Sequence, residues 1–196
     1  MNTKLATLAF GIVCLCVGNA VCRAQQPDDE GMKKWMEYMT PGQSHQLLAG
    51  RVGKWKLSIK MWMEIGQPPS EMESNSELKM IMDGRYLVES VKGDFQGTPF
   101  EGQNTTAYDN GSQKFISTWI DNMGTGVIIG EGTYSPDKKE FHYATRFTDP
   151  MTHKPSQGRS VDKMVDENTW IMQSYKKSPA GKEYMDMEIT YRRVTQ

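Results

Sequence analysis

Cysteine is scarce in this sequence and confined to one end of it. Only Cys14, Cys16 and Cys22 occur among the 196 residues, and all three precede Ala24. If the chain is cut after Ala24, the remainder carries no thiol, which excludes disulfides, cysteine catalysis and thiolate metal sites from it. Such a chain must be stabilised by a packed core alone, and a length of about 170 residues is enough to form one.

Neither sign of charge predominates. The chain has 23 Lys and Arg residues against 24 Asp and Glu, a formal net charge of −1 and an isoelectric point of about 6.3. Loss of Lys4 and Arg23 with the N-terminal segment leaves 21 basic against 24 acidic residues. Nucleic-acid-binding domains normally carry a concentrated basic surface, so we expect no nucleic-acid partner. With 37% hydrophobic residues the chain can still bury a core, which argues against wholesale disorder.

Long apolar runs are missing, apart from one between Leu5 and Val17. The run follows Lys4 and precedes small residues, which is the layout of a secretory signal peptide and too short for a membrane span. Ala24 and Ala20 are both candidate cleavage points. We therefore expect a secreted or periplasmic protein without a membrane span after cleavage. The residues before Cys22 lack the apolar-small-small pattern of lipoproteins, so no lipid anchor is expected.

Histidine is also rare, with only His45, His142 and His153 in the chain. There is no HExxH motif, no cluster of two histidines with one carboxylate and no calcium-binding loop. We therefore predict no metal site and no cofactor. The sequence also lacks the G-x-S-x-G elbow of serine hydrolases and a glycine-rich phosphate-binding loop.

The residues after the leader first show helical spacing. Apolar side chains three and four apart predict a short amphipathic helix that ends near Pro41-Gly42; they are Met32, Trp35, Met36 and Met39. We expect this stripe to be a packing face, as on a helix that covers the mouth of a barrel. A second short helix is predicted over Pro41–Leu48, with Thr40 as its N-cap and Gly50 just past its end.

From Trp55 onward the apolar residues alternate, which is the period of a β-strand. Trp55, Leu57 and Ile59 share one face of the first strand, and Asp83-Gly84 is a signal for a two-residue hairpin. Turn residues then recur at intervals of about eight to ten residues, which predicts about ten strands joined by short connections. Closure of such a sheet into a barrel removes its exposed edges.

The predicted fold class is therefore all-β, an antiparallel β-barrel of about ten strands with short N-terminal helices after a cleaved signal peptide. The predicted division of the chain is a signal peptide over 1–24, a tether and short helices over 25–49, and the barrel over 50–196. No internal repeat or long linker divides the barrel further.

Two features resemble lipocalin-type (calycin) barrels. Gly53-Lys54-Trp55 resembles their G-x-W motif at the opening of the first strand, and the last strand ends in Arg192-Arg193. In that family an arginine of the last strand packs over the tryptophan, and alternation makes Arg193 the better candidate here. The resemblance implies that Trp55 and Arg193 close one end of a lipocalin-like barrel, through a cation–π contact and hydrogen bonds.

Further segments, in the same order along the chain, resemble the bacterial family known as domain of unknown function 1579. They are Thr40-Pro41-Gly42 with His45 and Leu47, Asp83-Gly84-Arg85-Tyr86-Leu87, Tyr108-Asp109-Asn110, residues 117–126, Glu131-Gly132-Thr133-Tyr134, Asp149-Pro150-Met151-Thr152, and Met187-Glu188-Ile189-Thr190-Tyr191. One departure is Asp83, where the family has glycine, and it changes only the chemistry of the turn. The resemblance implies a lipocalin-like barrel and no particular activity, because the family has no established one.

An aromatic face provides the candidate binding site. Alternation places Phe115, Trp119 and Asp121 on one face of their strand, with Tyr108 and Tyr143 on neighbouring strands. His45 can join them from the short helix that plugs the barrel. If this face points inward, it forms a cavity for a small apolar or amphipathic ligand, since apolar walls supply affinity and a few polar groups fix orientation. The alternative is that these aromatic side chains simply fill a closed interior.

Two other functions stay open at this point. The first is an enzyme that uses Asp121, Asp149, Tyr108 or His45 as acid or base, which would need a raised carboxylate pKa inside a real pocket. Aspartates in such positions more often bond to the backbone of their own turn. The second is a filled barrel that acts through its surface as an envelope interaction module, which large exposed Met and Trp patches around Trp35 or Trp62 would favour.

Overall fold

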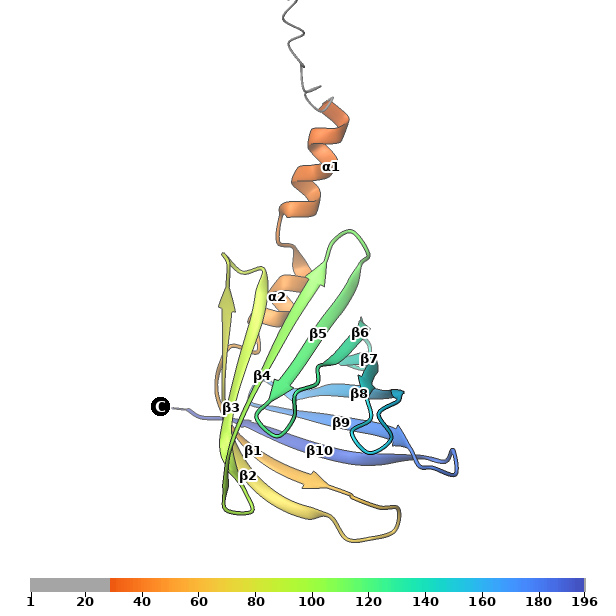
Figure 1. The fold of residues 1–196 in the computed structure, drawn as a ribbon. Coiled ribbons are helices and arrows are strands. Elements are labelled where there is room, and N and C mark those ends of the chain that lie inside the picture. The colour runs from red at the N-terminus through yellow and green to blue at the C-terminus, as the bar shows by residue number, and fades with distance from the viewer. Residues whose placement is uncertain (1–28, 196) are drawn as a thin grey trace, which may run out of the picture.

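A computed structural model describes residues 29–195 of the chain, so the predicted signal peptide lies outside the described residues. Two short helices precede ten strands (Figure 1). Their bounds are α1 (Asp29–Met39), α2 (Gln43–Ala49), β1 (Gly53–Met61), β2 (Ser70–Ile81), β3 (Tyr86–Phe95), β4 (Thr98–Asp109), β5 (Lys114–Asp121), β6 (Ile128–Ser135), β7 (Glu140–Thr148), β8 (Pro155–Asp166), β9 (Thr169–Lys177) and β10 (Glu183–Arg193).

The ten strands form one closed antiparallel barrel in which each strand pairs with its neighbour in sequence and β10 returns to pair with β1. This confirms the predicted all-β barrel of about ten strands. Strands β3 to β5 run steeply in Figure 1 and cross β8 to β10, which lie almost level. We call the end that carries α2 and the β2–β3, β4–β5, β6–β7 and β8–β9 connections the closed end, and the opposite end the open end.

Alternation decides which side chains enter the barrel. In β1, Trp55, Leu57 and Ile59 are buried, whereas Lys54 and Lys56 are exposed. The same pattern holds around the barrel and produces one core cluster. Its members are Leu48, Trp55, Leu57, Ile59, Leu78, Leu87, Val91, Phe115, Phe141, Tyr143, Trp170, Ile189 and Tyr191. Because apolar area removed from water stabilises a fold by about 25 cal/mol per Å², this cluster is the main source of stability.

The barrel closes where β1 meets β10. Trp55 is the direct partner of Arg193 in this pairing, and the Arg193 guanidinium carbon lies 4.2 Å from the centre of the Trp55 ring. The same guanidinium donates hydrogen bonds to the carbonyl oxygens of Glu167, Val52 and Gly50. Arg193 thus ties the last strand to the segment that precedes β1 and to the β8–β9 turn.

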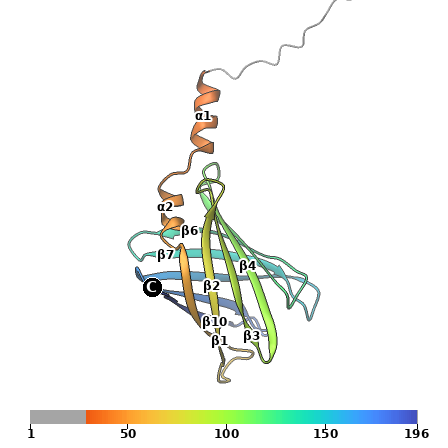
Figure 2. The ribbon, with the colours of Figure 1, turned by 90° about the vertical axis from the view of Figure 1, so that its left-hand side faces the viewer.

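Helix α1 stands away from the barrel, as Figures 1 and 2 both show. The prediction that its apolar stripe packs against the barrel is wrong, because Met32, Trp35, Met36 and Met39 are all exposed, Trp35 to 56%. Hydrogen bonds hold the helix at its C-terminal end. There the Asn110 side-chain amide donates to the carbonyl oxygens of Glu37, Tyr38 and Thr40.

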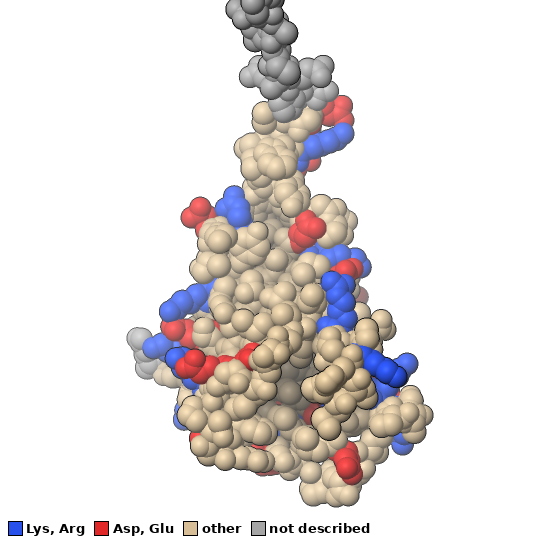
Figure 3. All heavy atoms as spheres, in the orientation of Figure 1, with Lys and Arg blue, Asp and Glu red and all other residues tan. Residues whose placement is uncertain are grey.

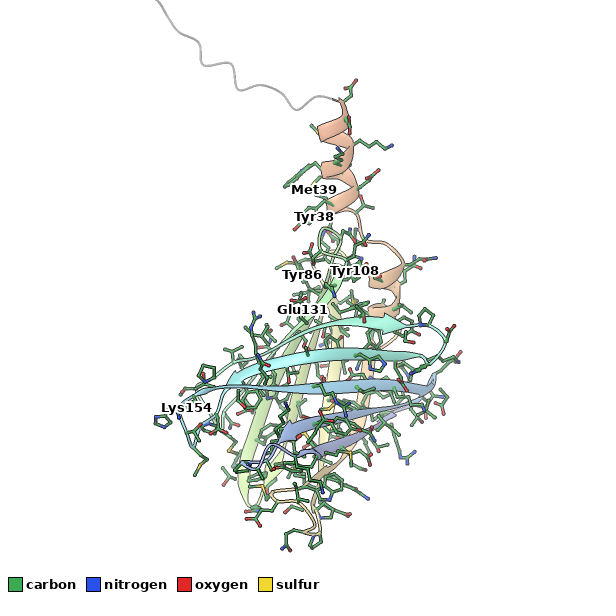
Figure 4. All side chains as sticks on the ribbon, turned by 90° about the vertical axis from the view of Figure 1, so that its right-hand side faces the viewer. Tyr38, Met39, Tyr86, Tyr108, Glu131 and Lys154 are labelled. Carbon is green, nitrogen blue, oxygen red and sulfur yellow. The ribbon has the colours of Figure 1, made fainter. Side chains whose placement is uncertain are left out.

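A second contact reaches the same end of α1. The Arg85 guanidinium donates a 2.9 Å hydrogen bond to the Met39 carbonyl oxygen. Figure 4 shows Tyr38 and Met39 at this foot of the helix, above Tyr86 and Tyr108. The hairpin tips of the closed end therefore cap the helix without covering its side. No helix within residues 29–195 is long and apolar enough to cross a membrane.

Two local predictions need correction. Helix α2 begins at Gln43 with Gly42 as its N-cap, not at Pro41 after Thr40. The β2–β3 connection has four residues, 82–85, rather than the two of a tight hairpin. Met82, Asp83 and Gly84 all have positive φ values, so the left-handed turn at Asp83-Gly84 extends one residue further toward the N-terminus than the sequence signal indicated.

Candidate functional site

A groove of about 690 Å³ lies at the closed end, between α2 and strands β4 to β6. We call it the α2 groove. None of its lining residues is charged; they are Gln43, Ser44, Gln46, Leu47, Tyr108, Gln113, Phe115, Thr133, Tyr134 and Pro136. Its volume falls in the range of about 300–1,000 Å³ that is usual for small-molecule sites.

Aromatic side chains connect the α2 groove with the core. Tyr108 and Phe115 are direct cross-strand partners of β4 and β5, and their ring centres lie 4.8 Å apart. The Phe115 ring meets Phe141 edge to face at 5.0 Å, and Tyr134 lies 4.7 Å from the same Phe141. Tyr143 stacks behind Phe141 at 6.4 Å. Phe115 and Tyr143 are buried, so Tyr108 and Tyr134 are the aromatic residues that the groove exposes.

Two glycines make room for this aromatic ladder. A side chain at Gly132 would collide with the Tyr143 ring and the His142 carbonyl oxygen, and one at Gly130 would collide with Ser117 Oγ. Gly132 pairs with Phe115 on one side and with Tyr143 on the other. The absence of side chains at both positions therefore leaves room for the Tyr143 ring.

His45, predicted as a ligand-binding residue, does not line the α2 groove. Its Nδ1 accepts a 3.0 Å hydrogen bond from the Gly42 backbone N–H, and its ring also bonds to the main chain of Tyr108. Burial lowers the pKa of His45, so the ring favours its neutral form. His45 therefore connects the start of α2 to β4. The centre of its ring lies 5.8 Å from that of Tyr108, in an edge-to-face arrangement.

Trp119 and Asp121 point into the same barrel but lie at its other end. The Trp119 indole N–H donates a 2.8 Å hydrogen bond to Asp121 Oδ2. The Trp119 ring lies against the backbone of Gly102, where a Cβ would collide with it, and stacks on Phe100 with 6.4 Å between ring centres. Figure 3 shows this face hollowed between β5 and strands β6 to β8. The structure thus divides the six predicted site residues between two ends of the barrel.

Asp121 and Asp149, considered as acid or base from the sequence, both bond to the backbone of their own turns. Asp121 accepts a hydrogen bond from the Met123 backbone N–H, and Asp149 accepts from those of Met151 and Thr152. The bonds from Thr152 hold the pKa of Asp149 below its ordinary value, which is the reverse of what a general acid requires. Among residues 29–195 there is also no group of three or more His, Cys, Asp or Glu side chains that could hold a metal ion.

Sequence reasoning missed the buried charges inside the barrel. Arg51 donates a 2.9 Å hydrogen bond to Asp162 Oδ2, and both residues are buried. Glu89 is buried as well and accepts a 2.6 Å hydrogen bond from Ser76 Oγ. Burial raises the pKa of Glu89, so its carboxyl keeps a proton to higher pH than usual.

One sequence signal could have located part of this network. Glu89 alternates with Leu87 and Val91, both in the core, so the strand period already places it inward. Arg51 carried no comparable signal, because it lies in the connection between α2 and β1. Neither Glu89 nor Asp162 lines the α2 groove.

Residues 40–193 match the family described as protein of unknown function (DUF1579). The chain belongs to this family. That result confirms the resemblance noted in the sequence, and the closed barrel is consistent with the lipocalin-like fold it implied. No curated protein matches the chain.

One solved structure supports the fold. The crystal structure of Rv2717c from M. tuberculosis is similar to this barrel with a TM-score of 0.57 and 12% sequence identity, over 80% of this chain and 100% of that one. A redesigned β-barrel, b11L5F_LGL, matches with a TM-score of 0.40 and 9% identity, over 76% of this chain and 96% of that one. At such low identity the likeness to Rv2717c concerns the fold alone, and the second match is too distant to support any argument.

Proposed function

We propose that this DUF1579 protein binds a small, uncharged apolar or amphipathic molecule in the α2 groove. The observation that carries the proposal is the chemistry of the groove lining, which combines aromatic and aliphatic side chains with neutral amides and hydroxyls and includes no charged residue. Small-molecule sites typically have this composition, because apolar walls supply affinity while a few polar groups fix the orientation of the ligand.

The lining divides into an apolar part and a polar part. Tyr108, Tyr134 and Leu47 contribute the larger apolar surfaces. The side-chain amides of Gln43, Gln46 and Gln113 can each donate and accept hydrogen bonds. A ligand with an apolar body and a neutral polar group fits both parts, whereas a charged ligand would lose hydration without gaining an opposite charge.

Fluorescence titration with N-phenyl-1-naphthylamine, a neutral apolar probe that brightens when it leaves water, tests the proposal. We expect the wild-type protein to bind it, and Tyr108→Ala to weaken binding by up to about tenfold, the scale of one lost aromatic contact. Tyr86→Ala is the matched control, because Tyr86 is a partly exposed tyrosine at the start of β3 outside the groove. Equal affinities for the two variants, with both still folded by circular dichroism, would contradict the proposal.

A further inference from the structure

A second groove, of about 780 Å³, lies at the open end of the barrel and, unlike the uncharged α2 groove, is lined by charged residues. We call it the cationic groove. Strands β6 to β10 and the ends of their connections line it, and its lining includes four cations against one anion. The cations are Arg146, Arg159, Lys176 and Lys177, and the anion is Glu183. This excess of positive charge stands out in a chain whose formal net charge is −1.

The single anion, Glu183, already forms an ion pair within the groove. Arg159 donates to both oxygens of Glu183, at 3.1 Å from Nε and 2.9 Å from Nη2, and its guanidinium lies 3.6 Å over the Tyr175 ring. These contacts hold Arg159 flat against the wall of the groove. Lys176 has its own partner, since its amine lies 3.4 Å from Asp186.

Two cations of the groove have no such partner. Within the described part of the chain, Arg146 and Lys177 form no direct ion pair. Arg146 faces outward from β7 between its cross-strand neighbours, Ile129 of β6 and Gln157 of β8. Lys177, at the end of β9, pairs in register with Glu183 and helps to lower the pKa of that carboxyl. The unpaired positive charge therefore belongs to Arg146 and Lys177, on strands β7 and β9.

Apolar side chains complete the lining. Ile129, Val127, Phe147 and Pro155 contribute hydrocarbon surface, and the Tyr175 ring lies beneath Arg159. A concave site of this volume with apolar walls suits a small molecule, and its two unpaired cations suit an anionic group. Figure 4 shows Lys154, on the β7–β8 connection beside this groove, at the far edge of the barrel from Tyr108 and α2.

We propose that the cationic groove is a second binding site, which takes a small anionic amphiphile with its acidic group at Arg146 and Lys177. The apolar part of the ligand lies along Ile129, which is the cross-strand partner of Arg146 and shares its face of the sheet. The site is independent of the α2 groove, because the two linings share no residue. Charge then distinguishes the two ligands, since only the open-end site can compensate an acidic group.

A pair of related probes tests this assignment. 1-Anilinonaphthalene-8-sulfonate is an anionic counterpart of N-phenyl-1-naphthylamine with the same ring system. We expect the double variant Arg146→Gln/Lys177→Gln to bind the sulfonate about tenfold more weakly, the scale of a lost charged hydrogen bond, and to bind the neutral probe unchanged. Raising the salt concentration from about 50 to about 500 mM should weaken binding of the sulfonate to the wild-type protein and leave the neutral probe unaffected.

The double variant Lys56→Gln/Arg192→Gln is the matched control. It removes the same charge from two exposed, outward-facing cations that pair across β1 and β10. Similar losses in both double variants would show a general charge effect and overturn the proposal. If Tyr108→Ala weakens the sulfonate as much as Arg146→Gln/Lys177→Gln does, the sulfonate occupies the α2 groove and the second site is wrong.

Two further results distinguish a small-ligand site from a membrane contact, and this inference from the function proposed for the α2 groove. If Arg146→Gln/Lys177→Gln reduces binding to phosphatidylglycerol vesicles but not to the free sulfonate, the groove is a membrane contact and the small-ligand assignment is overturned. If the neutral probe fails to bind the wild-type protein while the sulfonate shows the expected loss, this inference stands and the function proposed for the α2 groove fails.

Discussion

Charged side chains inside the barrel distinguish its interior from a purely apolar core. Arg51 and Asp162 form a buried ion pair, and the Arg51 guanidinium lies 3.7 Å over the Trp170 ring. Taking both charges out of water costs several kcal/mol per ion, which their attraction and hydrogen bond must offset. Arg51 Nε and the Tyr143 hydroxyl have no hydrogen-bond partner among the described residues.

At the same scale, Glu89 predicts a pH dependence of stability. Its raised pKa means that the folded protein binds the carboxyl proton more tightly than the unfolded chain does, for which the ordinary value is 4.5. The contribution of Glu89 to the free energy of unfolding is therefore full below that value and is lost as pH rises through the raised pKa. Glu89→Gln cannot ionise, so it should gain stability relative to wild type between about pH 5 and about pH 8.

Urea unfolding of wild type and Glu89→Gln at both pH values measures this difference. Glu73→Gln, on the exposed side of the adjacent strand β2, is the control and should show no such trend. A constant difference between wild type and Glu89→Gln across the pH range would mean that the Glu89 carboxyl has an ordinary pKa.

At the scale of elements, α1 differs from every strand because none of its residues is buried. Main-chain carbonyl oxygens at one end of the helix accept hydrogen bonds from Asn110 and Arg85, while its apolar stripe faces solvent. Strand packing thus supplies the stability of the molecule, and Asn110 and Arg85 of the closed end attach the helix to it.

The exposure of the α1 stripe predicts that a hydrophobic-to-polar double substitution in it has little effect on stability. Trp35→Ser/Met36→Ser should change the free energy of unfolding by no more than about 0.5 kcal/mol, as for other exposed positions. Denaturant unfolding followed by far-UV circular dichroism is the measurement. A loss of several kcal/mol would show that α1 packs against the barrel in solution.

For the whole molecule, the decisive contact is the one that converts a meander into a barrel. β1 and β10 are the first and last strands, and their pairing removes both edges of the sheet at once. The Trp55 and Arg193 side chains lie where this seam meets the closed end, so their contact joins segments that are distant in sequence.

The β1–β10 pairing predicts different effects on the free energy of unfolding when either of two adjacent arginines is replaced. Arg193→Ala removes a cation–π contact and three charged hydrogen bonds, and should lower the free energy of unfolding by roughly 2–4 kcal/mol. Arg192→Ala, one residue earlier and exposed, should stay within about 0.5 kcal/mol of wild type. Equal stabilities of the two variants in urea unfolding would argue against a closing role for Arg193.

The sequence was sufficient to predict the strand number, the alternation of buried and exposed residues, and the Trp55–Arg193 contact with the help of the family resemblance. Strand period and turn residues act over a few neighbouring positions, so these features are local. The same alternation correctly gave the inward direction of Phe115 and Trp119, which are separated by four residues in β5.

Tertiary structure alone decided how those inward residues are grouped. It placed Tyr108 and Phe115 beside α2 and Trp119 and Asp121 at the open end. It also placed the His45 ring where it accepts a hydrogen bond from the backbone at the start of α2. It also brought Arg51 into the barrel and gathered Arg146 and Lys177 in one groove. Each of these results depends on strand register and barrel closure, which join residues many positions apart, and no local pattern in the sequence records them.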